Sequence, residues 1–174
     1  MEVQFLTPEH AAEWLRLRVE ALELNPEAFS ASLEQYRSLN PEDVKKRLWS
    51  EEDAFVVGGF QDSHLVAMAG FYREQGPKSR HKGRVWGVYV TPGARRAGIG
   101  RTVMQALLHR INAIDGLDQV LLSVAATQVP AIRLYRSLGF ESFGTEPRAL
   151  RIGDRYIDEE HMVLRLMNRM DDRE

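Results

Sequence analysis

The spacing of apolar and polar residues divides the chain into alternating helices and strands. Apolar positions between Trp14 and Leu22 recur at helical spacing, which predicts a helix that begins at Thr7-Pro8 and ends at Asn25-Pro26. The other predicted helices begin at residues 40, 98 and 128, and strands are predicted at residues 3–6, 54–60, 64–73, 85–90, 119–124, 140–143 and 161–166. This order predicts a mixed α/β sheet with helices on both faces.

The length of 174 residues suits one well-buried domain. We expect a single domain over residues 1–168, followed by a solvated tail at residues 169–174.

Composition excludes several classes of protein. The net charge of -2 argues against nucleic acid as the main partner. The absence of cysteine excludes disulfides and thiolate chemistry, and the five histidines lack metal-ligand spacing, so we predict no metal. No apolar run approaches a membrane span, and the start of the chain lacks the pattern of a signal peptide. We therefore expect a cytoplasmic protein without a membrane partner.

A glycine-rich, basic loop at residues 95–100 separates the strand that ends at Val90 from the next helix. The first turn of a helix has unpaired amide groups and the positive end of the helix dipole, and glycines let an anion approach closely. The loop therefore suits a pyrophosphate, although a solvated turn is the simpler interpretation. A dinucleotide-binding Rossmann unit fits poorly, because the glycine spacing differs.

The helix that begins at Gln128 places Tyr135 two turns further along the same side. Tyr135 shares a face with Ile132 and Leu138, so its side chain is expected to point inward. Taken alone, this pattern fits a core tyrosine, but a phenol is also suited to protonating a departing thiolate.

Together these motifs resemble the GCN5-related N-acetyltransferase (GNAT) family. The pattern Arg-x-x-Gly-x-Gly at residues 95–100 is similar to the pyrophosphate loop of the family, and Val88-Tyr89-Val90 is similar to its pantetheine-binding strand. The segment from Ala131 to Phe140 resembles its later helix and strand. The two motifs occur in family order, and the close match covers residues 85–143. The resemblance implies a GNAT-like acyl-CoA N-acyltransferase fold, with a splayed central sheet flanked by helices.

The resemblance also implies an activity and a set of site residues. The activity is acetyl-CoA-dependent transfer of an acetyl group directly to a primary amine of a small molecule, peptide or protein. Acetyl-CoA is the co-substrate, no metal takes part, and a homodimer is possible. Tyr135 is the implied general acid. The implied cofactor-binding residues are Val88, Tyr89, Val90, Arg95, Arg96, Ala97, Gly98, Ile99, Gly100, Arg101 and Gln128.

Two of these assignments depart from the family pattern. Gln128 stands where the family commonly has asparagine, and its additional methylene alters any contact to pantetheine. The strand at residues 85–90 carries no acid, whereas many relatives place a glutamate there. Four residues and an ordered water remain as alternatives for the base; the residues are Glu74, His81, Glu159 and His161.

The acceptor is not specified by the sequence. In the family, segments corresponding to residues 25–39 and 145–160 line the acceptor site. Within the second segment, an acidic cluster is expected either to attract a cationic amine or to form a solvated loop; it comprises Asp154, Asp158, Glu159 and Glu160. Two alternatives to an acetyltransferase stay open, a non-catalytic acyl-CoA-binding sensor or complex subunit, and an acyltransferase for longer acyl chains.

Overall fold

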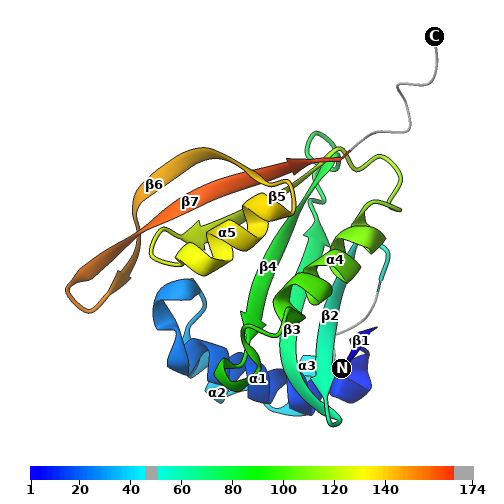
Figure 1. The fold of residues 1–174 in the computed structure, drawn as a ribbon, viewed down its shortest axis with the longest axis vertical. Coiled ribbons are helices and arrows are strands. Elements are labelled where there is room, and N and C mark those ends of the chain that lie inside the picture. The colour runs from blue at the N-terminus through cyan, green and yellow to red at the C-terminus, as the bar shows by residue number, and fades with distance from the viewer. Residues whose placement is uncertain (46–50, 167–174) are drawn as a thin grey trace.

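The computed structural model describes residues 1–45 and 51–166, which build a seven-stranded sheet in the order β1-β2-β3-β4-β5-β7-β6 (Figure 1). Neighbouring strands are antiparallel except β4 and β5, which are parallel. The strands are β1 (Glu2–Phe5), β2 (Ala54–Gln61), β3 (His64–Arg73), β4 (Lys82–Val90), β5 (Gln119–Ala125), β6 (Glu141–Ile152) and β7 (Arg155–Arg165).

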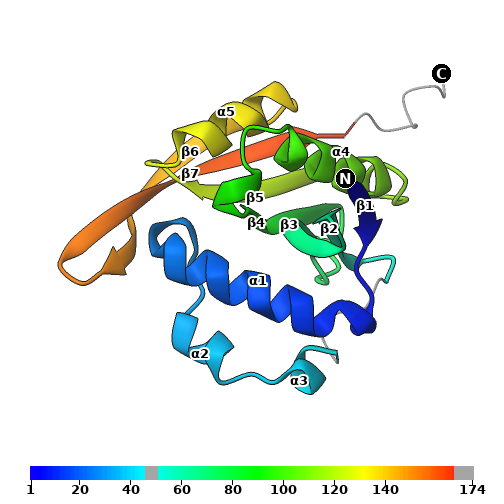
Figure 2. The same cartoon turned by 60° about the horizontal axis from the view of Figure 1, so that its bottom comes forward.

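Helices cover both faces of the sheet, as the sequence predicts (Figure 2). One face carries α1 (Ala11–Leu24), α2 (Leu33–Arg37) and α3 (Pro41–Lys45), and the other carries α4 (Ile99–Ile111) and α5 (Val129–Ser137). The mixed α/β fold is therefore confirmed. None of the helices within the described ranges is long and apolar enough to cross a membrane.

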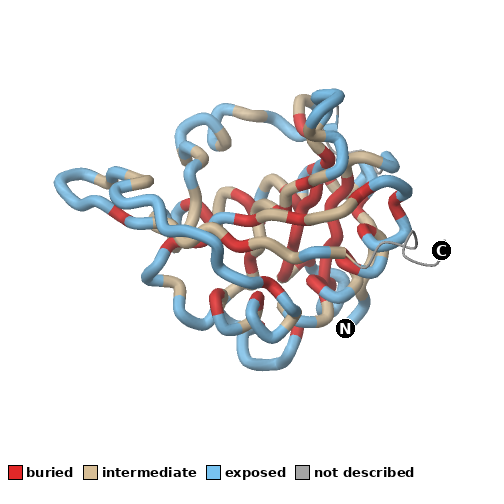
Figure 3. Tube along the Cα trace, turned by 90° about the horizontal axis from the view of Figure 1, so that it is seen from above, coloured by how far each residue is buried: buried red, intermediate tan, exposed pale blue. Residues whose placement is uncertain are grey.

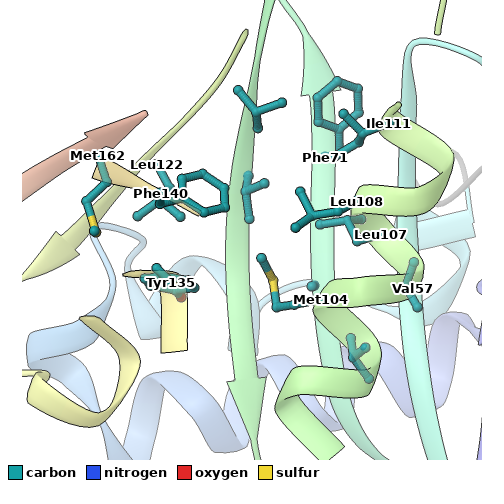
Figure 4. Packing of buried hydrophobic residues seen from close by; sticks show 14 of the residues in the cluster. Val57, Phe71, Met104, Leu107, Leu108, Ile111, Leu122, Tyr135, Phe140 and Met162 are labelled. Atoms are coloured by element: carbon teal, nitrogen blue, oxygen red, sulfur yellow. The ribbon is translucent and has the colours of Figure 1, made fainter. Parts of the chain in front are cut away.

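Two apolar clusters hold these layers together. The larger one fills the space between the sheet and the helices α4 and α5, where Met104, Leu107 and Ile111 pack on the strands (Figure 4). The smaller one lies between α1 and the opposite face, around Trp14 and Leu17. Burial of such side chains contributes most of the stability that fixes the strands in place.

The C-terminal hairpin differs most from the prediction. Strands were expected only at residues 140–143 and 161–166, whereas β6 and β7 form a long hairpin that extends away from the body and is largely exposed (Figure 3). The apolar pattern fails here because most of β6 is exposed, so no buried face produces an alternation of residues. The turn at Gly153 adopts a φ of +60°, which suits glycine.

Smaller differences concern element ends. β4 begins at Lys82 rather than residue 85, and the short helix α2 was not predicted. The predicted helix from residue 40 corresponds to α3, but its expected buried residues Leu48 and Trp49 lie outside the described residues, as does the predicted tail.

The sheet is splayed between β4 and β5. The two strands pair only where Lys82, Gly83 and Arg84 meet residues 119–121, and they diverge beyond that point (Figure 1). On its other side, β4 contains one extra residue relative to β3, and Gly87 in this bulge has a φ of +61°. The edge of β4 beyond the bulge therefore faces an opening rather than a neighbouring strand.

Candidate active site

A cavity of about 590 Å³ occupies the opening between β4 and α5. All the predicted cofactor-binding residues line it except Ala97, and Tyr135 lines it as well. Residues that sequence reasoning did not assign to the cofactor also contribute; they are Asn25, Ala28, Phe29, Ala94, Pro130, Ala131 and Leu134. The structure thus brings the glycine-rich loop, the strand and the tyrosine helix to one site.

The glycine-rich loop presents a row of free amides. Gly98 caps α4 with a φ of +76°, and Thr102 is the first residue of this helix whose amide binds a carbonyl, that of Gly98, at 3.1 Å. The amides of residues 96–101 have no acceptor within the described part of the chain. Free amides at the positive end of a helix dipole form an anion site.

The arginine side chains of the loop mainly hold it in place. Arg95 donates from Nε to the carbonyl of Val90 at 2.9 Å, and its guanidinium lies 5.6 Å from the ring centroid of Tyr89. Arg101 donates to Ser137 at 2.7 Å and so ties α4 to α5. The anion site therefore consists chiefly of main-chain groups.

Tyr89 is held by α1 rather than being free to react. Its hydroxyl donates to Glu20 at 3.1 Å, and Thr91 donates to the same carboxylate oxygen. Burial, followed by the charge of Glu20, raises the pKa of Tyr89 to about 12. This side chain anchors β4, and only its main chain is available to a ligand.

Tyr135 is buried on α5 and its ring meets that of Phe140 edge to face, with centroids 6.0 Å apart (Figure 4). Burial raises the pKa of its phenol above the ordinary value, so the hydroxyl keeps its proton at physiological pH. No hydrogen-bond partner for this hydroxyl exists among the described residues. Tyr135 lines the cavity together with Val88 and the glycine-rich loop.

A second, smaller space adjoins the cofactor cavity at Tyr135. A constriction of about 80 Å³ is lined by Gly87, Val88, Gln128 and Tyr135, among others. Beyond it lies a cavity of about 400 Å³ between α1 and the strands β4, β5 and β7. Ala28 and Phe29 line all three spaces, so the spaces adjoin one another.

The structure separates the four candidate bases into two groups. Glu74 pairs with Arg84 at 2.8 Å, and neither Glu74 nor His81 lines any of the three spaces. Glu159 lines the 400 Å³ cavity, and burial raises its pKa, with a further rise from Glu146 that His161 opposes. His161 reaches the same cavity indirectly.

A chain of hydrogen bonds connects His161 to this cavity. Its Nδ1 lies 2.9 Å from the hydroxyl of Ser123, which lines the cavity, and its Nε2 lies 3.0 Å from the carboxylate of Glu146. Ser123, His161 and Glu146 come from the adjacent strands β5, β7 and β6. Sequence reasoning missed Ser123 and Glu146, because their proximity depends on strand register.

The acidic cluster does not form one surface. Glu159 is its one member that lines the 400 Å³ cavity among the described residues. Asp158 accepts from the amide of Arg148 at 2.7 Å, Glu160 pairs with Arg136 at 2.8 Å, and Asp154 lies 4.0 Å from Arg151 at the hairpin tip. Successive residues of a strand point to opposite faces, which separates Glu159 from its two neighbours. The predicted loop is thus incorrect for this segment, which is mostly strand.

Arg18 is a further residue that the sequence analysis missed. It lies on α1, only 5% exposed, and lines the 400 Å³ cavity. A signal was present, because Arg18 falls within the helical stripe formed by Trp14, Leu17 and Ala21.

Potential metal ligands are scattered over the described residues. Within residues 1–45 and 51–166, no group of three or more histidine, aspartate or glutamate side chains is arranged to hold a metal ion.

The family of the chain follows from this fold and site. The model of the acetyltransferase (GNAT) family matches residues 12–140, about three quarters of the chain. The chain therefore belongs to the GNAT acetyltransferase family. Members of this family are acetyltransferases that use acetyl-CoA as the co-substrate.

Curated relatives and solved structures agree with this assignment. Mycothiol acetyltransferase of Streptomyces scabiei is 32% identical over 142 residues, which are 82% of this chain and 43% of the relative; that of Thermobifida fusca is 32% identical over 74% of this chain and 40% of the relative. The chain thus spans about two fifths of their length.

Among solved structures, a GNAT acetyltransferase from Streptococcus pneumoniae matches with a TM-score of 0.84 at 20% identity, covering 95% of this chain and 98% of that one. YncA of Salmonella typhimurium, solved with its cofactor acetyl-CoA, matches at 0.82 and 20% identity, covering 97% and 95%. These likenesses support the fold.

Proposed function

We propose that this chain is an N-acetyltransferase that transfers the acetyl group of acetyl-CoA directly to an amine. One observation carries the proposal: a single cavity joins the open edge of β4, the free amides at the start of α4 and the buried phenol of Tyr135. These three features match the pantetheine, the pyrophosphate and the thioester sulfur of the cofactor, in that order.

The open edge of β4 supplies binding groups for pantetheine. Beyond Arg84, β4 has no hydrogen-bonded partner on the side of β5, so the main chain of Val88 is exposed to the cavity. The amides of pantetheine satisfy these groups in the manner of an added strand. The pyrophosphate then lies against the amides of residues 96–101.

The transfer needs one proton acceptor and one proton donor. The acceptor ammonium loses one proton, and the neutral amine then forms a bond to the thioester carbonyl carbon while the carbonyl electrons move onto oxygen. The nitrogen, now positively charged, loses a second proton. When the carbonyl re-forms, the carbon–sulfur bond breaks and the electron pair leaves with the sulfur of CoA. Tyr135 donates its proton to this sulfur, and a proton released from the nitrogen restores the phenol. The products are the N-acetyl amine and free CoA.

Two groups at the second cavity support the proton acceptor role. Glu159 lines this cavity with a raised pKa, which makes its carboxylate a stronger base. The chain from Ser123 through His161 to Glu146 supplies a second route. Either group replaces the glutamate that β4 lacks.

The test is a screen of amine acceptors with acetyl-CoA, followed by free thiol release and by mass spectrometry of the product. The panel contains amino acids, amines, peptides and the acceptor of mycothiol acetyltransferases. An enzyme releases thiol only when an acceptor is present. A non-catalytic acyl-CoA-binding module instead binds acetyl-CoA, detected as a higher thermal midpoint, and releases no thiol with any acceptor.

We also propose that the protein acts in the cytoplasm, the compartment expected from its composition. Homodimer formation stays a prediction, and light scattering over a range of protein concentrations checks it.

A further inference from the structure

Arg18 stands out among the residues that line the second cavity, because it is a buried cation without a carboxylate partner. Its side chain is 95% buried, and no ion pair to it exists within the described residues. The atoms Nε and Nη1 are buried and have no hydrogen-bond partner there. Buried polar groups are nearly always satisfied, so these two N–H groups require an explanation.

The aromatic rings around Arg18 stabilise its buried positive charge, but they do not accept hydrogen bonds from its unpaired N–H groups. The guanidinium carbon lies 4.8 Å from the ring centroid of Phe29, 5.2 Å from that of Tyr36 and 5.9 Å from that of Trp86. Such rings attract a cation through their faces. The hydroxyl of Tyr36 also interacts with the guanidinium, but Nε and Nη1 still have no hydrogen-bond partner among the described residues. A carboxylate matches the planar geometry of such N–H groups.

Arg18 lines the 400 Å³ cavity beside Gly87, a residue that also lines the constriction. A Cβ atom built on Gly87 would lie 3.5 Å from Nη1 of Arg18, in ordinary van der Waals contact, so the guanidinium lies close to β4 with no side chain of residue 87 between them. Gly87 lines both the 400 Å³ cavity and the constriction, which it shares with Tyr135. An anion on Arg18 is therefore close to the point where the acetyl group enters.

The cavity also carries the opposite charge. Glu159 of β7 lines the same 400 Å³ space, whereas the other cation there, Arg84, is paired with Glu74 at 2.8 Å. One unpaired cation and one acid in a single cavity complement a zwitterion. An ammonium group suits the side of Glu159 and Ser123, and a carboxylate suits Arg18.

We propose that the acceptor is a free amino acid or a similar zwitterion, whose carboxylate is bound by Arg18. The amine lies only a few bonds from this carboxylate, because Arg18 adjoins the constriction at Gly87. The rings of Phe29, Tyr72 and Trp86 line the space left for its side chain. This inference rests on the proposed acetyltransferase function.

Matched acceptors test the inference on the unaltered protein. Each free α-amino acid is compared with its α-amide, which keeps the amine and the side chain but lacks the negative charge. The kcat/KM for the amino acid is expected to exceed that for the amide by about 10-fold to 100-fold, as for a lost charge-assisted hydrogen bond. Equal values for amino acid and amide, or a preference for amides and peptide N-termini, would overturn the inference while leaving the acetyltransferase function intact.

Variants then assign the preference to Arg18. Arg18→Met is expected to raise KM for the amino acid by about the same factor and to leave KM for the amide unchanged. A purely structural Arg18 would instead lower the thermal midpoint and impair both acceptors equally. If Arg18→Met does not fold, Arg18→Lys keeps the charge without the paired N–H geometry and should lose part of the preference.

A binding experiment separates the two proposals. With CoA bound, N-acetyl amino acids should raise the thermal midpoint of the unaltered protein, and their amides should not. If no acceptor of any kind yields thiol release, the proposed function fails. If thiol release occurs, but free amino acids react no faster than their amides and N-acetyl amino acids do not raise the thermal midpoint, only the proposed role of Arg18 is wrong.

Discussion

The hydroxyl of Ser123 lies 2.9 Å from Nδ1 of His161, and this contact connects the second cavity to the carboxylate of Glu146. If the acceptor proton leaves along this chain, His161→Asn should lower kcat by about 10²-fold, the low end for general-base catalysis. Ser123→Ala should have a similar effect, and the double variant should be no slower than either one, because the residues act as a unit. Additive effects, or full activity of His161→Asn, would place the chain outside the reaction.

Glu159 offers the competing route, and its raised pKa makes a second prediction about stability. A carboxyl whose pKa is raised by folding binds its proton more tightly in the folded state than in the unfolded chain. Stability therefore falls as the pH rises from the unfolded pKa, about 4.3, through the raised folded pKa. Glu159→Gln should thus have a slightly higher thermal midpoint than the unaltered protein at pH 8, and the advantage should shrink toward pH 4.

The rate of Glu159→Gln shows whether this carboxylate is the base. A loss of about 10²-fold in kcat, together with loss of the acid limb of the pH–rate profile, assigns the proton to Glu159. If Glu159→Gln is more stable and its turnover is unchanged, Glu159 is not the catalytic base.

Substitution of Gly100 tests whether the glycine-rich loop binds acetyl-CoA. A Cβ atom at this position would lie 3.3 Å from Val90 and 3.7 Å from Leu134, both of which line the cofactor cavity. Gly100→Val should therefore weaken acetyl-CoA binding by about 10-fold or more, measured by calorimetry. Gly93→Val is the matched control, because nothing lies within 4 Å of a Cβ atom at Gly93, and it should bind normally. Equal affinities of the two variants would contradict the assignment.

Tyr135→Phe separates a catalytic phenol from a packing residue. Phenylalanine keeps the edge-to-face contact with Phe140 and loses only the hydroxyl group. We expect kcat to fall by up to about 10²-fold while the KM for acetyl-CoA and the thermal midpoint stay nearly constant. A folded variant with full turnover would reduce Tyr135 to a core residue.

The grouping of the predicted cofactor-binding residues around one cavity was predictable because its signals are local. The glycine loop and the helix of Tyr135 are each contained in a short segment, and helical periodicity places Tyr135 on the inner face. The acceptor side was not predictable in the same way. It depends on the register that sets Ser123 opposite His161, and on a hairpin whose exposed strands lack an apolar alternation.

Arg18 illustrates a different limit. Its place in the apolar stripe of α1 is visible in the sequence, but an arginine on a helix is usually solvated. Only the three-dimensional structure shows the rings of Phe29 and Trp86 around it and the missing partners of its N–H groups.

Because β4 and β5 pair over only a short stretch, bound cofactor is expected to affect the stability and lifetime of the protein as well as its chemistry. The strands β4 and β5 pair at only a few residues, and acetyl-CoA bound as we propose would fill the gap beyond them. Occupied molecules should open rarely, whereas empty ones expose β4 to proteases and to amide exchange, since a ligand that binds the folded state stabilises it in proportion to its concentration. The cellular half-life of this protein should therefore lengthen when acetyl-CoA is abundant and shorten during carbon starvation.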